Sequence, residues 1–467
     1  MHMRLDGQFI KTVLPDAMCV GNPEQLLGKF VIDSRKISTG DVFVALKGGT
    51  LDGHNFITDA LANGATGLLI QADKQACLEK LTPAQRQKVT AIVVKSPEDA
   101  LYKLAAAWRT LFTCPIVGIT GSIGKTTTKE MLATIVRLSG KECVVSSGNY
   151  NTQLGLALTL LSLRPEHYCA IVEMGISKRG EMARLAQLAR PTIGVITTIA
   201  HQHMDGLGSL QDIASEKREI FKFFKPDNIG IINGDQAVLA AIAYPHPVVK
   251  FGFKTTNQVQ ARRIAVNGQR TTGVLKLYNE RFPITLQTPH RGRLTNALAS
   301  AAAAYFLNIP SNFIIEGIQS CEVVPGRFQA VPLSNGRGLI INDCYNANPE
   351  SMKEALFAFD RLETRGHKIA VLGDMLGLGV NSAFWHRQLG RSLRKAPSIE
   401  RVIFVGEHVK TAQSTIPRGV QYKMVPTWLE AATALEEYMH EDVTILVKAS
   451  NGMDLQFLVN KLTPTAI

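Results

Sequence analysis

The segment from Gly118 to Thr128 reads Gly-Ile-Thr-Gly-Ser-Ile-Gly-Lys-Thr-Thr-Thr and contains the residue types that hold phosphate groups. An apolar, strand-like run precedes it and a helix-like run follows it, which is the setting of a phosphate-binding loop. Glycines let backbone N–H groups converge on phosphate oxygens, the lysine reaches the terminal phosphates, and the next hydroxyl binds magnesium. The residues expected to bind ATP here are Gly121, Ser122, Gly124, Lys125, Thr126 and Thr127.

The spacing of this loop is a variant of the usual one. The first glycine normally lies five residues before the glycine that precedes lysine, whereas Gly118 lies six before Gly124. The alternative is a glycine turn that opens a helix beside an unrelated lysine. The order of strand, loop, Gly-Lys-Thr and helix favours a nucleotide site over that alternative.

The elements that position this loop follow from the alternation of apolar runs and helical segments. A length of 467 residues exceeds what one core usually serves and suggests about three domains. Short strand-like runs alternate with helical segments between residues 29 and 95, again from 115 to 243, and again after 327. This pattern predicts α/β domains with parallel sheets and right-handed crossovers. We expect domains at 1–112, 113–325 and 326–467.

The composition excludes several classes of protein. With 45% hydrophobic and 19% charged residues the chain is globular, and its seven cysteines form no CxxC pair. The net charge of +12 is spread without a basic run, so we expect anionic small substrates and no nucleic acid. The N-terminal segment lacks a secretory signal, and no apolar stretch reaches the ~18 residues of a membrane span. We therefore expect a cytoplasmic protein without a transmembrane helix.

The loop sequence TGSIGKTTTKEM resembles the ATP loop of the Mur ligase family, and further segments resemble that family in the same order. The fold that this resemblance implies is a three-domain Mur ligase: an N-terminal UDP-sugar-binding domain, a central parallel-sheet P-loop ATPase domain and a Rossmann-like C-terminal ligase domain. The matching segments are DSRKISTGDVFVA from Asp33, DGHNF from Asp52, GNYNTQLG from Gly148, EMG from Glu173, PGR from Pro325, DCYNANP from Asp343 and LGDM from Leu372.

The activity implied by the resemblance is ATP-dependent amide formation in peptidoglycan precursor synthesis. Transfer of the γ-phosphoryl group to a carboxylate gives an acyl phosphate, which an amine then attacks, so the site needs positioned cations more than a covalent nucleophile. The motifs TGSxGKTTTKEM and YNANPESM are most similar to the branch that adds D-alanyl-D-alanine to UDP-muramoyl-tripeptide. The resemblance implies a monomer that uses ATP and Mg²⁺.

Two alternatives remain open. One is a Mur-type ligase with another amino-acid acceptor, although the diamino-acid branch typically shows TGTNGKTT. The other is an ATP-binding regulator that has lost ligation. Departures from the family pattern motivate this second reading, and they occur at Thr198, Gly292, Arg293 and Asn451.

Glu173 ends an apolar run and should emerge at the carboxyl edge of a parallel sheet, where ligands bind in such folds. By resemblance, the metal ligands are Thr126, Glu173, His203 and a carbamylated Lys217, and the catalytic residues are Lys125, His203 and Lys217. Carbamylation requires a neutral amine, whereas an unperturbed lysine has a pKa of about 10.4. Neighbouring Arg218 or bound magnesium could lower that pKa. Without the resemblance, Lys217 reads as a surface lysine and Glu173 as an exposed strand end.

The resemblance also implies substrate contacts. Asn296, Arg327 and Asp343 are expected near the adenosine and phosphates of ATP. Without the resemblance, these residues would be interpreted as a helix cap and a surface ion pair. The residues expected at the UDP-substrate are Ser34, Arg35, Lys47, Asn149 and Asn151. Those expected at the dipeptide are Tyr345, Asn346 and Asn348. His201 has no counterpart with an assignable role.

Overall fold

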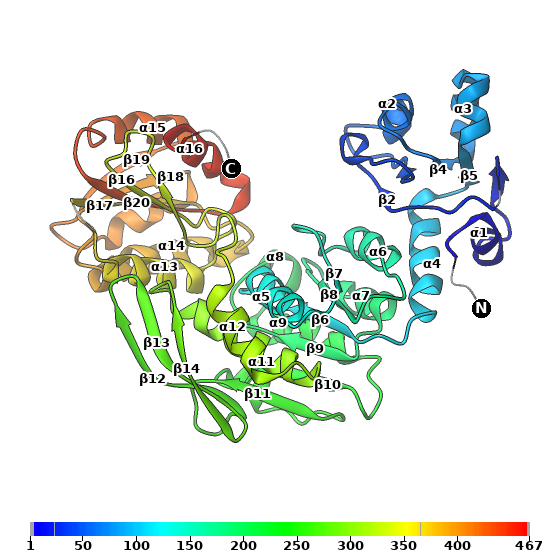
Figure 1. The fold of residues 1–467 in the computed structure, drawn as a ribbon. Helices are drawn as coiled ribbons and strands as arrows, with labels where there is room; N and C mark the ends of the chain where they lie inside the picture. The colour runs from blue at the N-terminus through cyan, green and yellow to red at the C-terminus, as the bar shows by residue number, and fades with distance from the viewer. Residues whose placement is uncertain (1–3, 23, 365, 465–467) are drawn as a thin grey trace. The chain divides into compact units, whose positions relative to one another are not determined.

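The computed structural model describes residues 4–22, 24–364 and 366–464, so the first three residues of the N-terminal segment lie outside it. The fold is of mixed α/β type and contains three sheets (Figure 1). Their strand orders are β1-β5-β4-β3-β2, β14-β13-β12-β11-β10-β9-β6-β8-β7 and β15-β16-β20-β17-β18-β19. The predicted succession of α/β segments is confirmed.

The chain divides into two compact units. The first comprises Met1–Gly118, Lys141–Met174 and Ala183–Pro191, and the second comprises Ile119–Gly140, Gly175–Met182 and Thr192–Ile467. The C-terminal sheet belongs wholly to the second unit, together with the glycine-rich loop. Contacts between that loop and the C-terminal part of the chain therefore lie within one compact unit.

The N-terminal sheet is parallel except for β1, which pairs antiparallel with β5. Leu68 and Ile70 of β4 and Ala91 and Val93 of β5 share a buried core with Ile57 of α2. Alternate residues of a strand point to one face, so these residues lie on the face that α2 covers. The strands are β1 (Met18–Val20), β2 (Phe30–Val31), β3 (Val42–Val44), β4 (Gly67–Gln71) and β5 (Thr90–Val94), and the helices are α1 (Gly7–Val13), α2 (Ile57–Ala62), α3 (Pro83–Lys88) and α4 (Pro97–Thr110), with 3₁₀ turns η1 (Ser34–Lys36), η2 (Gly53–Phe56) and η3 (Ala72–Lys80).

The nine-stranded sheet combines parallel strands with an antiparallel meander. The pairs β7–β8, β9–β10, β10–β11 and β11–β12 are parallel, whereas β12–β13 and β13–β14 are antiparallel. The strands are β6 (Ile116–Thr120), β7 (Cys143–Val145), β8 (Cys169–Glu173), β9 (Ile193–Ile196), β10 (Ile229–Asn233), β11 (Val248–Gly252), β12 (Val259–Asn267), β13 (Arg270–Leu277) and β14 (Glu280–Leu286).

Strand β14 forms one edge of this sheet. Pro283 lies within β14 and has no N–H to offer to a further strand. The backbone N–H of Thr285 donates to Oε1 of Gln319 on α12, at 2.9 Å. One side chain and one proline thus occupy hydrogen-bonding positions along this edge.

The helices around this sheet are α5 (Lys125–Leu138), α6 (Gln153–Leu161), α7 (Glu181–Ala189), α8 (Met204–Leu207), α9 (Leu210–Arg218), α10 (Ala237–Ala240), α11 (Arg291–Phe306) and α12 (Ser311–Ser320), with a 3₁₀ turn η4 (Glu219–Phe221). Two of them are short. Helix α9 leaves α geometry after Arg218, and α10 is a single turn. Pro226 and Pro245 follow these segments, and a proline disfavours helical geometry at the residue before it.

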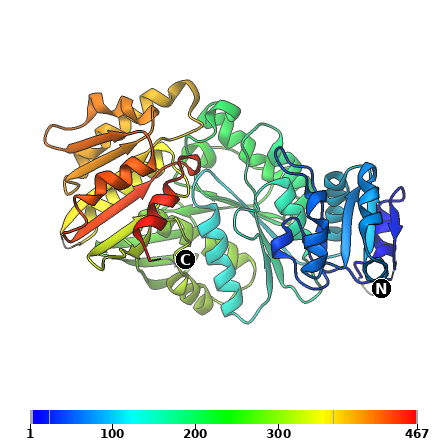
Figure 2. The same cartoon turned by 90° about the horizontal axis from the view of Figure 1, so that it is seen from above.

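The C-terminal sheet lies between two layers of helices (Figure 2). Along β17, Ala370 and Leu372 join the core that contains α13 and α14, whereas Ile369 and Val371 join the core that contains α15 and α16. All its strand pairs are parallel except β15–β16. The strands are β15 (Gln329–Pro332), β16 (Gly338–Asn342), β17 (His367–Gly373), β18 (Arg401–Val405), β19 (Gln421–Val425) and β20 (Val443–Lys448), and the helices are α13 (Pro349–Arg361), α14 (Ser382–Ser392), α15 (Trp428–Glu436) and α16 (Leu455–Leu462), with 3₁₀ turns η5 (Gly379–Asn381), η6 (Leu393–Lys395), η7 (His408–Thr415) and η8 (Asn451–Met453).

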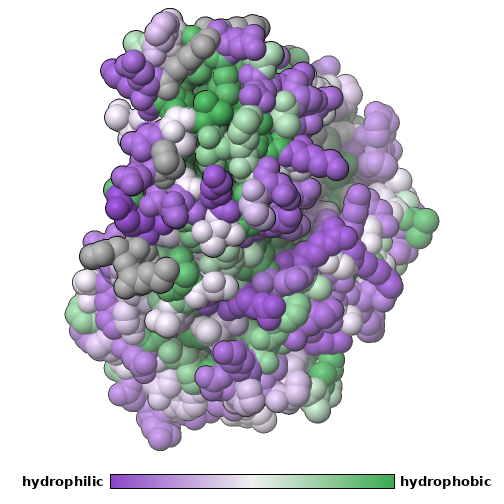
Figure 3. Space-filling model, turned by 90° about the vertical axis from the view of Figure 1, so that its right-hand side faces the viewer, coloured by the Kyte–Doolittle hydropathy of each residue, from purple (hydrophilic) through white to green (hydrophobic). Residues whose placement is uncertain are grey.

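The surface agrees with the mixed composition of the sequence. Figure 3 shows a face on which hydrophilic residues predominate and apolar areas lie between them. Within the described ranges, none of the helices combines the length and the apolar character needed to span a membrane.

Candidate active site

The glycine-rich loop connects β6 to α5, as the sequence predicts. Gly124 precedes the first residue of α5 and has φ = 92°, a conformation that side chains other than glycine rarely adopt. A Cβ at this position would lie 2.2 Å from Oδ1 of Asn296. Gly121 is similarly confined, because a Cβ there would lie 1.9 Å from Oγ1 of Thr197. The loop therefore needs glycine at both positions for reasons of backbone geometry and of space.

Ser122 holds the loop against the segment that follows β9. Its backbone N–H donates to the carbonyl oxygen of Thr198 at 2.7 Å, and its hydroxyl donates to the carbonyl oxygen of Ala200 at 3.0 Å. The N–H of Ile123 donates to the same Thr198 oxygen at 3.3 Å. These contacts use backbone atoms of Thr198, so the departure from the family pattern at this residue does not disturb the anchor.

Lys125 and Thr126 begin α5 and face different partners. The Nζ of Lys125 donates to the carbonyl oxygen of Gly121 at 2.8 Å, within the loop itself. The buried hydroxyl of Thr126 accepts from Nη2 of Arg327 at 3.4 Å, and the Arg327 guanidinium lies 4.0 Å from the centre of the Tyr345 ring. The half-buried Thr127 lies in the same first turn of α5. The structure thus brings the predicted residues Thr126, Arg327 and Tyr345 together.

Asn296 lies on α11, directly against the loop, and is buried. One turn later Ser300 donates its hydroxyl to the carbonyl oxygen of Thr128 on α5, at 3.1 Å. Arg293, one of the departures from the family pattern, is used structurally: its guanidinium donates to the carbonyl oxygens of Cys321 and Glu322 after α12. The segment that differs from the family therefore still seats α11 beside the nucleotide loop.

Lys217 on α9 is buried. Burial lowers its pKa well below 10.5, and the positive charge of Lys125 lowers it further, against the opposing effect of Glu216. Arg218, which the sequence suggested as the cause, donates to the carbonyl oxygen of Val238. The neutral amine that carbamylation requires is therefore favoured by burial and by Lys125.

His203 also has a lowered pKa, because it is largely buried and because Lys125 and Lys217 disfavour its charged form. Asp205 and Glu181 act in the opposite direction. A neutral imidazole keeps a lone pair available for a metal ion or a proton. Among the predicted residues, Lys125, His203 and Lys217 are thus one electrostatically coupled group.

Glu173 ends β8 and is 1% exposed. Its Oε1 accepts from Nδ2 of Asn151 at 2.9 Å, and its Oε2 has no hydrogen-bond partner among the described residues. A buried carboxylate oxygen without a donor is costly unless a cation neutralises it. This side chain fits the predicted role of metal ligand, and Asn151 orients it.

Within the described residues no group of three or more His, Cys, Asp or Glu side chains is arranged to hold a metal ion. Magnesium commonly takes only one or two carboxylates from the protein and completes its shell with water and substrate phosphates. A single buried carboxylate such as Glu173 is compatible with that mode.

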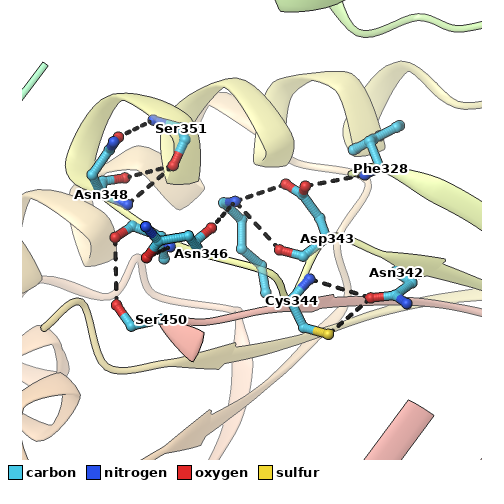
Figure 4. A network of polar contacts seen from close by, with 10 residues as sticks. Phe328, Asn342, Asp343, Cys344, Asn346, Asn348, Ser351 and Ser450 are labelled. Carbon is cyan, nitrogen blue, oxygen red and sulfur yellow. Dashed lines mark hydrogen bonds and ion pairs between the residues drawn. The ribbon is translucent and has the colours of Figure 1, made fainter. Parts of the chain in front are cut away.

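Lys448 holds the loop after β16. Figure 4 shows Asp343, Asn346 and Asn348 of this loop within one network of polar contacts. The Nζ of Lys448 lies 2.7 Å from Oδ2 of Asp343 and donates to the carbonyl oxygen of Asn346 at 3.0 Å. Oδ1 of Asp343 accepts from the N–H of Phe328 at 3.0 Å, and the Ser450 hydroxyl donates to the carbonyl oxygen of Ala347. Asp343 is therefore part of a buried network and not of a surface ion pair.

Asn348 ends this loop as the N-cap of α13. Its Oδ1 accepts from the N–H of Ser351 at 2.9 Å, and the Ser351 hydroxyl accepts from the N–H of Asn348 at 3.0 Å. The side chain of Asn346 accepts from the N–H of Ala347 at 2.8 Å. Of the predicted dipeptide residues, Asn348 is fixed by capping, which leaves its neighbour Asn346 to present polar atoms.

The residues predicted to bind the UDP-substrate lie in the first unit. Ser34 is buried in η1, and Arg35 beside it is exposed and bonded to Asp33. Lys47 and Asn149 are exposed, whereas Asn151 is bound to Glu173. An exposed guanidinium and ammonium are suited to the phosphates of such a ligand.

Lys448 is the principal residue that sequence reasoning did not identify. It stands in the segment Lys-Ala-Ser-Asn, which attracted notice only because Asn451 departs from the family pattern. Asn451 itself is exposed and begins η8. A lysine that ends a largely apolar run such as VTILVK is a usable signal, since a charged side chain so placed needs a buried partner.

Comparison with protein families gives a match to all three segments of the chain. Residues 30–109 match the Mur ligase family catalytic domain, residues 119–304 the Mur ligase middle domain, and residues 326–451 the Mur ligase glutamate ligase domain. These matches cover most of the 467 residues.

Individual relatives are similar over nearly their whole length. The chain is 32% identical to UDP-N-acetylmuramoyl-tripeptide–D-alanyl-D-alanine ligase of Bacillus subtilis and 32% identical to that of Escherichia coli, with 92% of each chain covered in both cases. MurF of Acinetobacter baumannii superposes with a TM-score of 0.82 at 26% identity, over 98% of this chain and 99% of that one. MurF ligase of Thermotoga maritima in complex with ADP gives 0.75 at 28% identity, over 93% and 96%.

Proposed function

Because this chain belongs to the Mur ligase family and has its three-domain α/β fold, we propose that it is the ligase that adds D-alanyl-D-alanine to UDP-N-acetylmuramoyl-tripeptide. It is an ATP-dependent enzyme that forms an amide bond in peptidoglycan synthesis. The observation that carries the choice of substrate is the similarity to ligases of that name over 92% of both chains. The TGSIGKTTTKEM loop and the YNANP loop support it.

The first step transfers the γ-phosphoryl group of ATP to the terminal carboxylate of the tripeptide and leaves ADP. The glycine loop supplies backbone N–H groups, and Lys125, released from the carbonyl of Gly121, neutralises charge on the phosphates. Arg327 lies against Thr126 and adds a second cation at the same end of α5. The product of this step is an acyl phosphate, which is reactive toward amines.

In the second step the amino group of the dipeptide attacks the acyl carbon and phosphate leaves. The amine must be neutral to attack. His203, kept neutral by burial and by nearby lysines, has one free lone pair, so it is suited to receive this proton only when that nitrogen is not bound to the metal. We assign the YNANP loop to the dipeptide, since Asn346 presents polar atoms beside the buried Lys448. Lys448 positions this loop and is not itself placed at the reacting atoms.

Magnesium would be held by Glu173, Thr126, His203 and Lys217 in its carbamylated form, and would neutralise the charge of the phosphates being transferred. The unpartnered Oε2 of buried Glu173 supports this assignment. Carbamylation of Lys217 is supported by its burial and lowered pKa, because carbon dioxide reacts with the neutral amine. The modification would also give Lys125 an anionic neighbour in place of a neutral amine.

We assign Ser34, Arg35, Lys47 and Asn149 to the UDP moiety, with Arg35 as the residue best suited to bind phosphate.

For the purified protein we predict a monomer. Gel filtration with light scattering measures the mass directly against the 51.0 kDa of the chain. A mass of twice that value or more contradicts the monomer without affecting the proposed reaction.

The test of the function is phosphate release from ATP and Mg²⁺ with UDP-muramoyl-tripeptide and D-alanyl-D-alanine, each omitted in turn. We expect release only with all components, and a product whose mass equals that of the UDP-pentapeptide. Turnover with a single amino acid in place of the dipeptide would establish the alternative of a Mur-type ligase with another acceptor. ATP binding without turnover on any acceptor would establish a regulator.

A further inference from the structure

In the chain, His201 stands between Ala200, which contacts the nucleotide loop, and His203, which is assigned to the metal. The residue before it, Ala200, accepts through its carbonyl oxygen from the hydroxyl of Ser122 in the glycine-rich loop, at 3.0 Å. Two residues after it stands His203. The backbone at His201 is therefore tied to the loop that receives the phosphates of ATP.

The side chain of His201 reaches a different domain of the fold. Its Nδ1 lies 2.5 Å from Oε1 of Glu350, and its backbone N–H donates to Oε2 of Glu350 at 3.2 Å. Both oxygens of one carboxylate are thus engaged by one residue. The imidazole also packs against the Trp385 ring, with 4.4 Å between ring centres. A second contact joins the segment that follows β9 to the C-terminal domain: the backbone N–H of Met204 donates to the carbonyl oxygen of Gly377 at 2.8 Å.

Glu350 stands at the start of α13, in the first turn after the N-cap Asn348. A carboxylate in the first turn of a helix is favourably placed with respect to the helix dipole, and capping by Asn348 and Ser351 makes this turn rigid. A displacement of Glu350 therefore moves Asn348 and the YNANP loop with it. The contacts form a continuous path from Ser122 through Ala200, His201 and Glu350 to Asn348.

We propose that the His201–Glu350 contact is a positioning element that couples occupation of the nucleotide loop to the placement of the YNANP loop, and hence to binding of the amine substrate. The identity of that substrate rests on the proposed function, whereas the coupling itself rests on the path of contacts. His201 and Glu350 are positioning residues, because neither is placed at the reacting atoms. The pair is partly exposed, with side-chain exposures of 22% and 36%, so its effect should be modest.

The test uses hydrogen–deuterium exchange of the whole chain with and without Mg²⁺ and a non-hydrolysable ATP analogue. In the wild type we expect the analogue to slow exchange in peptides that cover residues 345–352. In His201→Gln and in Glu350→Gln this protection should be lost, while protection of the glycine-rich loop remains. Equal protection of residues 345–352 in the variants and in the wild type would overturn the proposal.

A kinetic test separates positioning from general damage. We expect His201→Gln and Glu350→Gln each to raise the KM for D-alanyl-D-alanine at saturating ATP by roughly five- to tenfold, with less than a twofold change in the Kd of ATP measured without the dipeptide. The double variant should be no worse than the worse single variant, since both remove one contact. Additive effects, or an increase in the KM for ATP alone, would contradict the coupling.

His367→Gln is the matched control, because His367 forms a comparable contact with Glu400 at 2.6 Å on an exposed part of the C-terminal domain. It should change neither the exchange of residues 345–352 nor any KM. A wild type that does not use the dipeptide would contradict the proposed function and leave the exchange experiment as the decisive test of the coupling. The two hypotheses can therefore fail separately.

Discussion

Lys448 and Asp343 form a buried ion pair beneath the YNANP loop, with 2.7 Å between Nζ and Oδ2 and side-chain exposures of 2% and 11%. Removing one member of a buried pair leaves the other charged and unpaired, which costs about 3–5 kcal/mol. We predict that Lys448→Met lowers the free energy of unfolding by that amount in urea titrations followed by circular dichroism.

Lys410→Met is the control for this change. Lys410 pairs with Glu407 at the same distance of 2.7 Å, but the two side chains are 49% and 71% exposed. We expect a change of less than about 0.5 kcal/mol for this exposed pair. Equal effects of the two substitutions would show that burial of the Lys448 pair contributes nothing to stability.

Lys217→Met should abolish ligation and yet stabilise the protein. Because the folded-state pKa of Lys217 lies well below 10.5, the unfolded chain binds more protons than the folded chain between these two values. The wild type thus loses stability as the pH falls from 10.5 toward the folded pKa, and methionine removes this loss. We expect the melting midpoint at pH 7 in carbonate-free buffer to rise by about 2 °C, with a gain that shrinks toward pH 10.5.

The control is Lys222→Met, since Lys222 is an exposed partner of Glu219 shortly after the same helix. It should alter neither the midpoint nor turnover. A lower midpoint for Lys217→Met at pH 7 would contradict the lowered pKa. Retained turnover would exclude Lys217 from catalysis.

The pKa values of His203 and His367 should be shifted from 6.5 in opposite directions. Burial lowers the pKa of His203, whereas the hydrogen bond to Glu400 raises that of His367. Consequently His203 contributes stability that is complete above pH 6.5 and is lost as the pH falls. His367 contributes stability that is complete below 6.5 and is lost as the pH rises through its folded value. NMR titration of ¹⁵N-labelled histidines, assigned with His203→Gln and His367→Gln, measures both, and the reverse order would refute the assignment of causes.

Glu173→Gln should raise the Mg²⁺ concentration needed for half-maximal turnover and lower turnover by about 100-fold, because an amide cannot supply the anionic oxygen that now lacks a partner. The fold should persist, since glutamine can still accept from Asn151. Initial rates as a function of Mg²⁺, and their loss with a chelator, provide the measurement. Glu166→Gln, at an exposed position, should leave the magnesium dependence unchanged.

Gly124→Ala should raise the Kd of a fluorescent ATP analogue at least tenfold, because the new Cβ would collide with Asn296 and the residue has φ = 92°. Gly140→Ala isolates the effect of the dihedral angle. Gly140 has φ = 76°, and a Cβ there would meet no atom within 4 Å. The control should lose about 1 kcal/mol of stability and retain nucleotide binding. Equal affinity in the two variants would contradict the steric explanation.

The sequence predicts those parts of the site that lie in one stretch of chain. Glycines, Lys125 and Thr126 follow one strand and open one helix, so spacing and residue type suffice to place them. The strands that are buried on both faces can be predicted equally well, because they are short apolar runs between helices. Metal ligation and carbamylation came from resemblance alone and stay predictions.

Pairings between remote residues could not be predicted. The Lys448 ammonium meets the backbone of Asp343 across 105 residues, and His201 meets Glu350 across 149. Nothing in the local sequence of either partner identifies the other. The first contact depends on the pairing of β16 with β20, and the second depends on how the segment after β9 packs against α13. The cause of the Lys217 pKa was missed for the same reason, since it lies in burial and in a lysine from another helix.

The edge strand β14 bears on the tendency of this protein to self-associate while it folds. Large parallel sheets form slowly, so strand edges stay open to other chains during synthesis, and self-association is the usual hazard. Pro283 and the contact between Thr285 and Gln319 remove bonding positions that an incoming strand would need. Strand β14 is thus protected against pairing with strands of other chains. It is distant in sequence from every residue assigned to catalysis.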